Sequence, residues 1–144
     1  METCTMGRVT TEATIESLKD LYGVELGVLA PENVRRITVP DALVDTGATL
    51  LSIPPSLIQR LGLKRVDTKR VRSSSGVVEV GLYDTVRLTI QGRTCPTDVL
   101  EVPEGSPVLI GQIPLENLDF VVDLQSRQLT GNPAHGGEQM FELF

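Results

Sequence analysis

The chain has 144 residues, with 13 Lys and Arg residues, 19 Asp and Glu residues and a formal net charge of −6 at pH 7. This length excludes a two-lobed enzyme, and we expect residues 1–144 to form one domain that folds without a metal ion or a disulfide. The acidic balance argues against nucleic acid as the main partner, because phosphate binding depends on clustered Lys and Arg. No apolar run approaches the ~20 residues that cross a bilayer, so we predict no membrane partner.

The cysteines and the N-terminal residues bear on the compartment. Cys4 and Cys95 are too few for a disulfide framework, and reduced cysteines are typical of cytosolic proteins. Residues 1–7 have neither the basic start nor the apolar stretch of a secretory signal. We therefore predict a cytoplasmic protein in which residues 1–7 are a disordered lead.

The predicted elements are mostly short strands, because apolar and β-branched residues alternate with polar ones along much of the chain. In chain order, the strand-like segments cover residues 9–15, 34–39, 42–44, 50–53, 68–72, 77–80, 85–90, 98–102, 108–110, 120–122 and 128–130. Pro40 is expected to end the second of these segments. The turn residues 73–76 are expected to join their two neighbouring segments into a hairpin.

Helices contribute less to the predicted fold. Residues 17–22 have capping-box spacing that suits a single turn, and prolines introduce short helices over 56–61 and 114–118. From Gly131 onward the chain contains a Gly136-Gly137 pair, and we expect residues 131–144 to be a loose tail. Many short strands with few helices favour an all-β barrel or sandwich.

The stretch Leu43 to Ala48 carries the clearest chemical signal. An apolar strand delivers the carboxylate of Asp45 to its end, and Gly47 follows where the chain must turn. By residue frequencies alone, an Asp-Thr-Gly tripeptide occurs in on the order of a few per cent of chains of this length. The tripeptide alone is therefore weak evidence for a catalytic site, and the features that accompany it decide how specific the signal is.

The sequence resembles the retropepsin-like aspartic peptidases, the single-domain relatives of pepsin, from about residue 34 to residue 123. Residues 45–48 (DTGA) match the catalytic motif of that family, and residues 108–111 (VLIG) match its second motif. Residues 75–84 look like the flap and the strand that leaves it. The chain looks more like the small prokaryotic members than like the viral ones. This resemblance implies a closed acid-protease barrel of six or more strands with one or two short helices.

The chemistry of such a site sets a requirement on assembly. Hydrolysis of a peptide bond needs a base that deprotonates water and an acid that protonates the leaving nitrogen. Two adjacent carboxyl groups can share one proton and fill both roles. Because the chain has one Asp-Thr-Gly, a pair requires two copies related by a two-fold axis. The resemblance thus implies an aspartic endopeptidase, homodimeric, acting on peptide or protein substrates without a cofactor or metal ion.

The resemblance also implies roles for individual residues. Asp45 would be the catalytic residue, as one half of the acid–base pair. Thr46 would brace the two loops across the dimer axis, and Gly47 would offer its carbonyl group to the substrate backbone. The flap would fold over the substrate and exclude water. The implied substrate-binding residues are Thr46, Gly47, Ala48, Arg72, Ser73, Ser74, Ser75 and Gly76.

Departures from the family leave other hypotheses open. Retroviral members carry an ion pair at the positions that are Thr49 and Gln112 here, and Ser73 to Ser75 replace an apolar, glycine-rich flap tip. The alternative is a catalytically weak or inactive domain that serves as a dimerisation or peptide-binding module. A monomer that dimerises only on substrate is a third possibility.

Other kinds of site receive less support. His135 is the only histidine, and its glycine-rich surroundings give a Ser-His-Asp arrangement no rigid support. Neither cysteine has a close metal-ligating partner, and the glycines lack a phosphate-binding spacing. The basic residues between 64 and 72 are interpreted as a solvated segment. Arg72 could favour acidic substrate groups, although a solvated arginine is the simpler interpretation.

Overall fold

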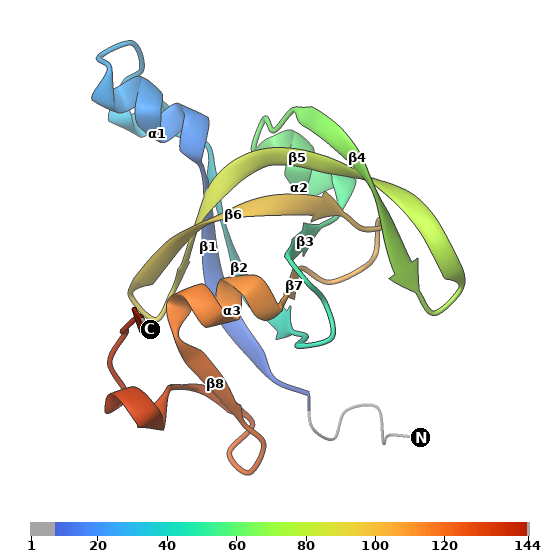
Figure 1. The fold of residues 1–144 in the computed structure, drawn as a ribbon. Coiled ribbons are helices and arrows are strands. Elements are labelled where there is room, and N and C mark those ends of the chain that lie inside the picture. Colours follow the sequence, from blue (N-terminus) through green and yellow to red (C-terminus); the bar gives the residue numbers. More distant parts are fainter. Residues whose placement is uncertain (1–7, 144) are drawn as a thin grey trace.

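A computed structural model of the protein describes residues 8–143. The expected disordered lead, residues 1–7, lies outside the described residues. One seven-stranded sheet has the order β1 (Thr10–Ser17), β2 (Arg36–Val44), β7 (Leu109–Ile110), β3 (Leu51–Ile53), β6 (Arg93–Glu101), β5 (Gly76–Ile90) and β4 (Arg65–Ser73). Because β1 also pairs with β5, six of these strands close into a ring and β4 stays outside it (Figure 1). The predicted all-β closed barrel is confirmed.

Short helices and a second hairpin complete the described part of the chain. They are α1 (Leu18–Glu25), the 3-10 helix η2 (Pro31–Asn33), α2 (Pro55–Arg60), α3 (Gln112–Leu118), the strand pair β8 (Phe120–Asp123) and β9 (Gln128–Gly131), and the 3-10 helix η3 (Pro133–His135). The three α-helices occupy the three segments with helix-start signals, and α1, expected as a single turn, has eight residues. Ser17 caps α1, because its Oγ accepts a hydrogen bond from the backbone N–H of Asp20.

The second strand differs from the prediction at Pro40. Instead of ending before it, β2 continues through Pro40 up to the residue that precedes the motif aspartate. The register with β1 shifts here: Thr11 pairs with Ala42, whereas Ala13 pairs with Val39. A bulge accommodates proline, because a residue in it need not donate a ladder hydrogen bond. The longer strand carries the chain directly into the site.

The hairpin of β4 and β5 is longer than the sequence predicts. β5 has 15 residues and unites the predicted segments 77–80 and 85–90 into one strand. Its first half pairs with β4, and its second half pairs with β6 and β1 in the barrel wall. In Figure 1 the hairpin projects from the barrel, and most of its residues beyond the wall are exposed.

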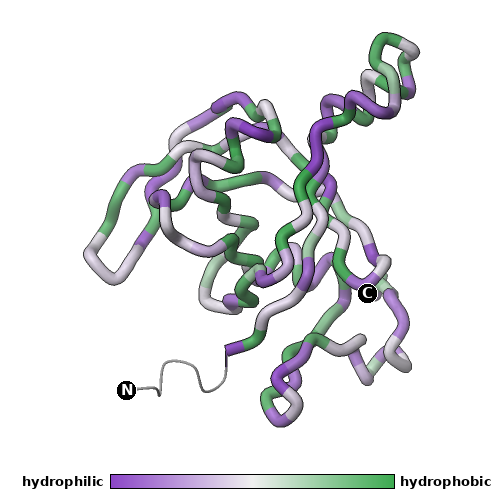
Figure 2. Tube along the Cα trace, turned by 180° about the vertical axis from the view of Figure 1, so that it is seen from behind, coloured by the Kyte–Doolittle hydropathy of each residue, from purple (hydrophilic) through white to green (hydrophobic). Residues whose placement is uncertain are grey.

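The core fills the inside of the ring. Apolar side chains from alternate strand positions meet there, and hydrophobic positions recur along the strands in Figure 2. Fully buried members of this core include Ala13, Ile15, Leu51, Ile53, Leu88, Val99 and Ile110. Within residues 8–143, no helix has the length and apolar character needed to cross a membrane.

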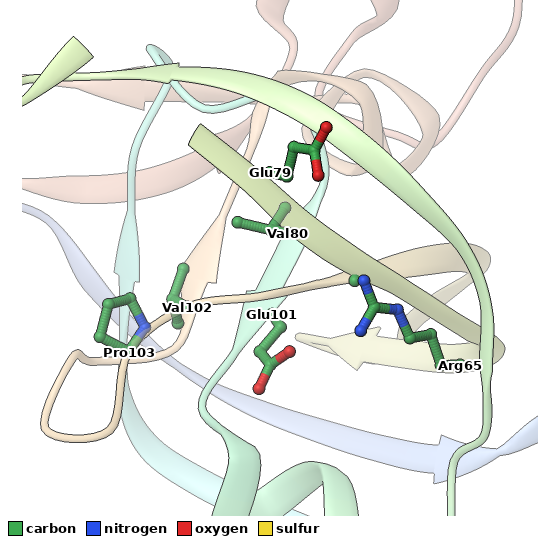
Figure 3. A pocket seen from close by; sticks show the side chains of 7 residues that line it. Arg65, Glu79, Val80, Glu101, Val102 and Pro103 are labelled. Carbon is green, nitrogen blue, oxygen red and sulfur yellow. The ribbon is translucent and has the colours of Figure 1, made fainter. Parts of the chain in front are cut away.

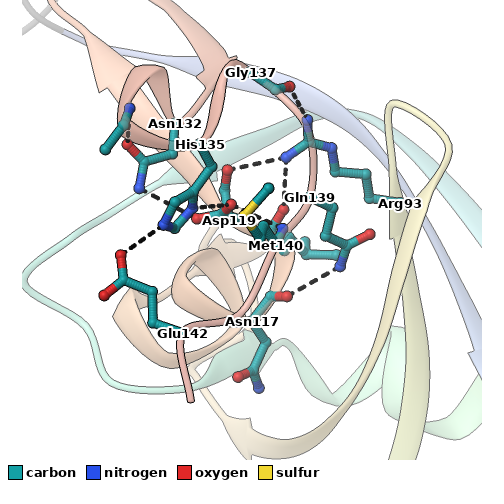
Figure 4. Close-up of polar contacts among 11 residues, drawn as sticks. Arg93, Asn117, Asp119, Asn132, His135, Gly137, Gln139, Met140 and Glu142 are labelled. Carbon is teal, nitrogen blue, oxygen red and sulfur yellow. Dashed lines mark hydrogen bonds and ion pairs between the residues drawn. The ribbon is translucent and has the colours of Figure 1, made fainter. Parts of the chain in front are cut away.

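The segment after β9, expected to be loose, makes polar contacts with the end of α3 (Figure 4). The two ring nitrogens of His135 lie 2.6 Å from Oδ2 of Asp119 and 2.8 Å from Oε2 of Glu142. The backbone N–H of Met140 donates to the same Asp119 oxygen over 3.0 Å. These contacts hold the segment against the domain. The segment is therefore attached rather than loose.

Arg93 adds to the same attachment. Its guanidinium group donates to the carbonyl oxygens of Leu118 and Asp119, each over 2.9 Å, and also to the carbonyl oxygen of Gly137. The group lies 4.5 Å from the ring centroid of Phe120, within the range of a cation–π contact. One side chain of the barrel wall therefore joins the end of α3 to the C-terminal segment.

Candidate active site

The motif aspartate lies at the point where β2 leaves the barrel. The backbone N–H of Asp45 donates to the carbonyl oxygen of Ile110 over 2.9 Å, and its own carbonyl oxygen accepts from the N–H of Ala48 over 3.0 Å. Its carboxylate oxygen Oδ1 accepts from the N–H of Gly47 over 3.0 Å. The loop backbone thus fixes the direction of a half-buried carboxylate, while Thr46 and Gly47 are exposed.

The second motif lies directly beside this loop. β2 and β7 are parallel neighbours, with Val44 opposite Ile110. The N–H of Gly111 then donates to the carbonyl oxygen of Leu50 over 3.1 Å. A Cβ atom on Gly111 would lie 2.5 Å from that oxygen and 2.8 Å from the carbonyl carbon of Ala48. Glycine is needed here because two backbone segments approach closely, and not because of a turn.

The start of α3 also bonds to the motif loop, at the two positions where a pair of charges is absent. The N–H of Gln112 donates to the carbonyl oxygen of Ala48 over 2.8 Å, and that of Ile113 donates to Thr49 over 3.0 Å. The side chains of Thr49 and Gln112 are exposed, and Gln112 donates to Glu116 within α3. Backbone hydrogen bonds therefore hold the loop without the missing charges.

The flap residues lie at the tip of the hairpin of β4 and β5. Ser73 Oγ donates to the carbonyl oxygen of Gly76 over 3.0 Å and accepts from the N–H of Ser75. It also lies 3.1 Å from the Oγ of Ser75. Gly76 has a φ of +113°, which favours glycine. The tip is exposed and is closed by its own hydrogen bonds.

The structure thus divides the predicted site residues into two groups. Asp45, Thr46, Gly47 and Ala48 form one turn, and Arg72–Gly76 form the end of a separate hairpin. Among residues 8–143, no hydrogen bond joins the two groups. In Figures 1 and 2 the hairpin projects on the same side of the barrel as the turn.

A comparison with known families decides what this arrangement is. The model of a family described as aspartyl protease, Asp_protease_2, matches residues 33–114, which include the Asp45 loop, the hairpin and Gly111. The chain belongs to this family of retropepsin-like aspartyl proteases. No match to a curated protein was found.

Two hollows adjoin the hairpin of this aspartyl protease domain. One of about 380 Å³ is lined by Arg70, Val71, Arg72 and Val77. A second, of about 260 Å³, lies between the hairpin and the end of β6 (Figure 3). Its charged lining residues are Arg65, Glu79 and Glu101. Glu101 does not stand out in the sequence, since only the pairing of β5 with β6 brings it beside the hairpin.

The geometry does not support a metal site or a cysteine nucleophile in the described part of the chain. Over the described part of the chain, no group of three or more His, Cys, Asp or Glu side chains could hold a metal ion. Burial raises the pKa of the Cys95 thiol to about 11, which keeps it protonated at neutral pH and suits a core side chain rather than a nucleophile.

Proposed function

We propose that this protein is an aspartic endopeptidase whose catalytic pair consists of Asp45 from each subunit of a homodimer. The observation that carries the proposal is the half-buried Asp45 carboxylate, oriented by the N–H of Gly47 in a loop that packs on Gly111. Membership in the aspartyl protease family supports the same chemistry. Since each chain supplies one Asp-Thr-Gly, the second carboxyl group has to come from another copy.

The proposed reaction uses one proton shared by the two carboxyl groups. The ionised carboxyl takes a proton from water as the water oxygen bonds to the peptide carbon. A carboxyl proton then goes to the leaving nitrogen as the carbon–nitrogen bond breaks, which leaves one proton on the pair. Thr46 would brace the two loops, Gly47 and Ala48 would contact an extended substrate, and residues 72–76 would cover it.

Replacement of Asp45 tests the chemistry directly. Asp45→Asn should abolish cleavage of a diverse peptide library, because an amide can neither accept the water proton nor donate one to the leaving nitrogen. Asp41→Asn is the matched control, since Asp41 is an exposed residue of the same strand. Circular dichroism should show the same fold in both variants. Equal cleavage by Asp45→Asn would end the proposal.

Mixed subunits test whether the pair spans a dimer. When wild-type and Asp45→Asn chains exchange at equal amounts, only wild-type pairs carry two aspartates, so activity per wild-type chain should fall to about half. Activity that stays proportional to the wild-type chain would show that each subunit acts alone. Sedimentation at several concentrations would also separate a stable dimer from a monomer that pairs only on substrate.

The polar flap tip favours one competing function. Its serines hydrogen-bond to one another and offer little apolar cover to a substrate. A peptide-binding or dimerisation module would bind members of the library and cleave none. A catalytic pair instead predicts maximal cleavage on the acidic side of neutrality, where the two carboxyls share one proton. A maximum above about pH 9 would contradict the pair.

A further inference from the structure

The outer strand of the hairpin concentrates positive charge in an otherwise acidic chain. Residues 64–72 contain five of the 13 basic residues and one of the 19 acidic residues. The basic residues are Lys64, Arg65, Lys69, Arg70 and Arg72. The surface formed by β4 therefore differs in sign from the net charge of the chain.

Part of this charge is already engaged by neighbours on the same strand. Lys69 lies 3.3 Å from the carboxylate of Asp67. Arg70 and Arg72, by contrast, take part in none of the ion pairs and side-chain hydrogen bonds found among residues 8–143, and both are exposed. Glu79 lies opposite Arg70 in the ladder without forming an ion pair with it, and an apolar valine lies opposite Arg72. Both guanidinium groups are therefore accessible to a binding partner.

The two arginines border a hollow of about 380 Å³ together with Val71 and Val77. The planar fork of a guanidinium group matches a carboxylate in two hydrogen bonds, which is stronger than a contact between neutral groups. Val77 is 52% exposed and can pack against the methylene groups of an acidic side chain. The chemistry of the hollow therefore suits Asp or Glu side chains.

The position of β4 indicates the conformation of the bound chain. In the described part of the protein, β4 ends the sheet and pairs with β5 alone, so its outer edge presents unpaired backbone groups. An extended peptide can add to such an edge. Side chains two residues apart on a strand point to the same face, as Arg70 and Arg72 do. A matching peptide would carry its acidic residues two positions apart.

We propose that the edge of β4 binds an extended peptide segment with acidic residues at positions i and i+2, held by Arg70 and Arg72. The binding itself depends only on the hairpin. The further role, selection of substrates for cleavage at Asp45, rests on the proposed function.

Fluorescence anisotropy with labelled peptides of one composition tests the proposal. A peptide with Glu at i and i+2 should bind the Asp45→Asn protein, which cannot cleave it, about tenfold more tightly than a peptide with adjacent Glu residues or with Gln in both places. Arg70→Gln/Arg72→Gln should remove this preference. The matched control, Arg60→Gln/Arg127→Gln, removes two exposed arginines elsewhere and should keep it.

A charge reversal makes the test independent of folding defects in a single variant. Arg70→Glu/Arg72→Glu should bind a peptide with Lys at i and i+2 in place of the acidic one. Equal binding of spaced and adjacent Glu peptides, or unchanged binding by Arg70→Gln/Arg72→Gln, would overturn the proposal. Cleavage of neutral peptides would then still support the protease. Conversely, spaced-Glu binding without cleavage of any peptide would keep the docking site and reject the protease.

Discussion

The Asp45 loop and the tip of the hairpin are held in opposite ways. The loop after Asp45 receives backbone hydrogen bonds from Gly111, the N-cap residue of α3, and from Gln112 and Ile113 in its first turn. The tip at Ser73–Gly76 is closed only by bonds among its own residues. Tertiary contacts thus fix the loop, whereas the tip depends on local turn chemistry. The position of the Asp45 carboxylate therefore depends on contacts between elements, whereas the conformation of the tip depends on residues 73–76 themselves.

Glycines in the two regions make the difference measurable. Gly111 has no room for a side chain, because backbone atoms of the loop lie where a Cβ would be. Gly76 has open space around it, and only its positive φ of +113° disfavours other residues. A methyl group added at each position therefore tests tertiary packing in one case and local backbone strain in the other.

Gly111→Ala should have the largest effect. The new Cβ would overlap backbone atoms of Leu50, Thr49 and Ala48, which cannot rotate away as a side chain could. We expect the free energy of unfolding to fall by about 1–3 kcal/mol or more. Peptide cleavage should fall about 100-fold, since the Asp45 carboxylate moves with the loop. Urea unfolding and kcat/KM measure the two effects, and wild-type values for both would refute the close packing.

His135→Gln should give a smaller effect that depends on pH. Hydrogen bonds with Glu142 and then Asp119 raise the pKa of His135, and the bond from His135 lowers the pKa of Asp119. The histidine's contribution to stability is full below its ordinary pKa of 6.5 and is lost as pH rises through the raised value. The contribution of Asp119 is full above its ordinary pKa of 3.8 and is lost as pH falls through the lowered value.

The C-terminal segment should accordingly be held best in mildly acidic solution. Because His135 is the only histidine, one NMR titration assigns its pKa without ambiguity. The amide of Met140 should exchange faster at pH 9 than at pH 5.5 after correction for intrinsic exchange, and His135→Gln should remove this difference. A His135 pKa at or below 6.5 would contradict the observed contacts.

Gly76→Ala should cost about 1 kcal/mol of unfolding free energy, the price of a positive φ in a residue with a Cβ. Circular dichroism of the barrel should not change, because nothing lies within 4 Å of the added methyl group. A loss as large as that of Gly111→Ala would remove the distinction between the two regions.

Ser73→Ala should have the smallest effect, about 0.5 kcal/mol or less in unfolding free energy. Water can replace the hydroxyl bonds at an exposed tip, so little net stability depends on them. Thermal unfolding measures the change. A loss above about 1 kcal/mol would show that the tip is packed against the domain rather than closed by itself.

Local signals in the sequence predict much of the barrel and the motif loop. An apolar strand that ends at Asp45, and turn residues between two alternating segments, determine structure within a few neighbours. The need for glycine at position 111 could be predicted only from a family motif. A side chain there would collide with backbone atoms about 60 residues earlier in the chain, which local sequence cannot show. Pro40 misled the prediction, since the bulge that accommodates it depends on the register with β1.

The C-terminal segment also shows that local sequence does not report contacts between distant residues. Gly136 and Gly137 favour a loose tail, yet His135 meets Asp119, which is 16 residues earlier and lies at the end of α3. Composition within a short window cannot report such a contact. The hollow that contains Glu79 and Glu101 is likewise created by strand pairing, and neither glutamate stands out in the sequence.

The length of β5 has one more consequence. The same unbroken strand forms one arm of the projecting hairpin at one end and the barrel wall at the other, and its register with β6 shifts between Tyr83 and Val86. Asp84, within that shift, accepts from the N–H of Lys64 and from the side chain of Lys19. These contacts fix β5 at the point where the hairpin leaves the barrel wall, so a displacement of the hairpin would be transmitted to β1 and β6 through the strand ladder.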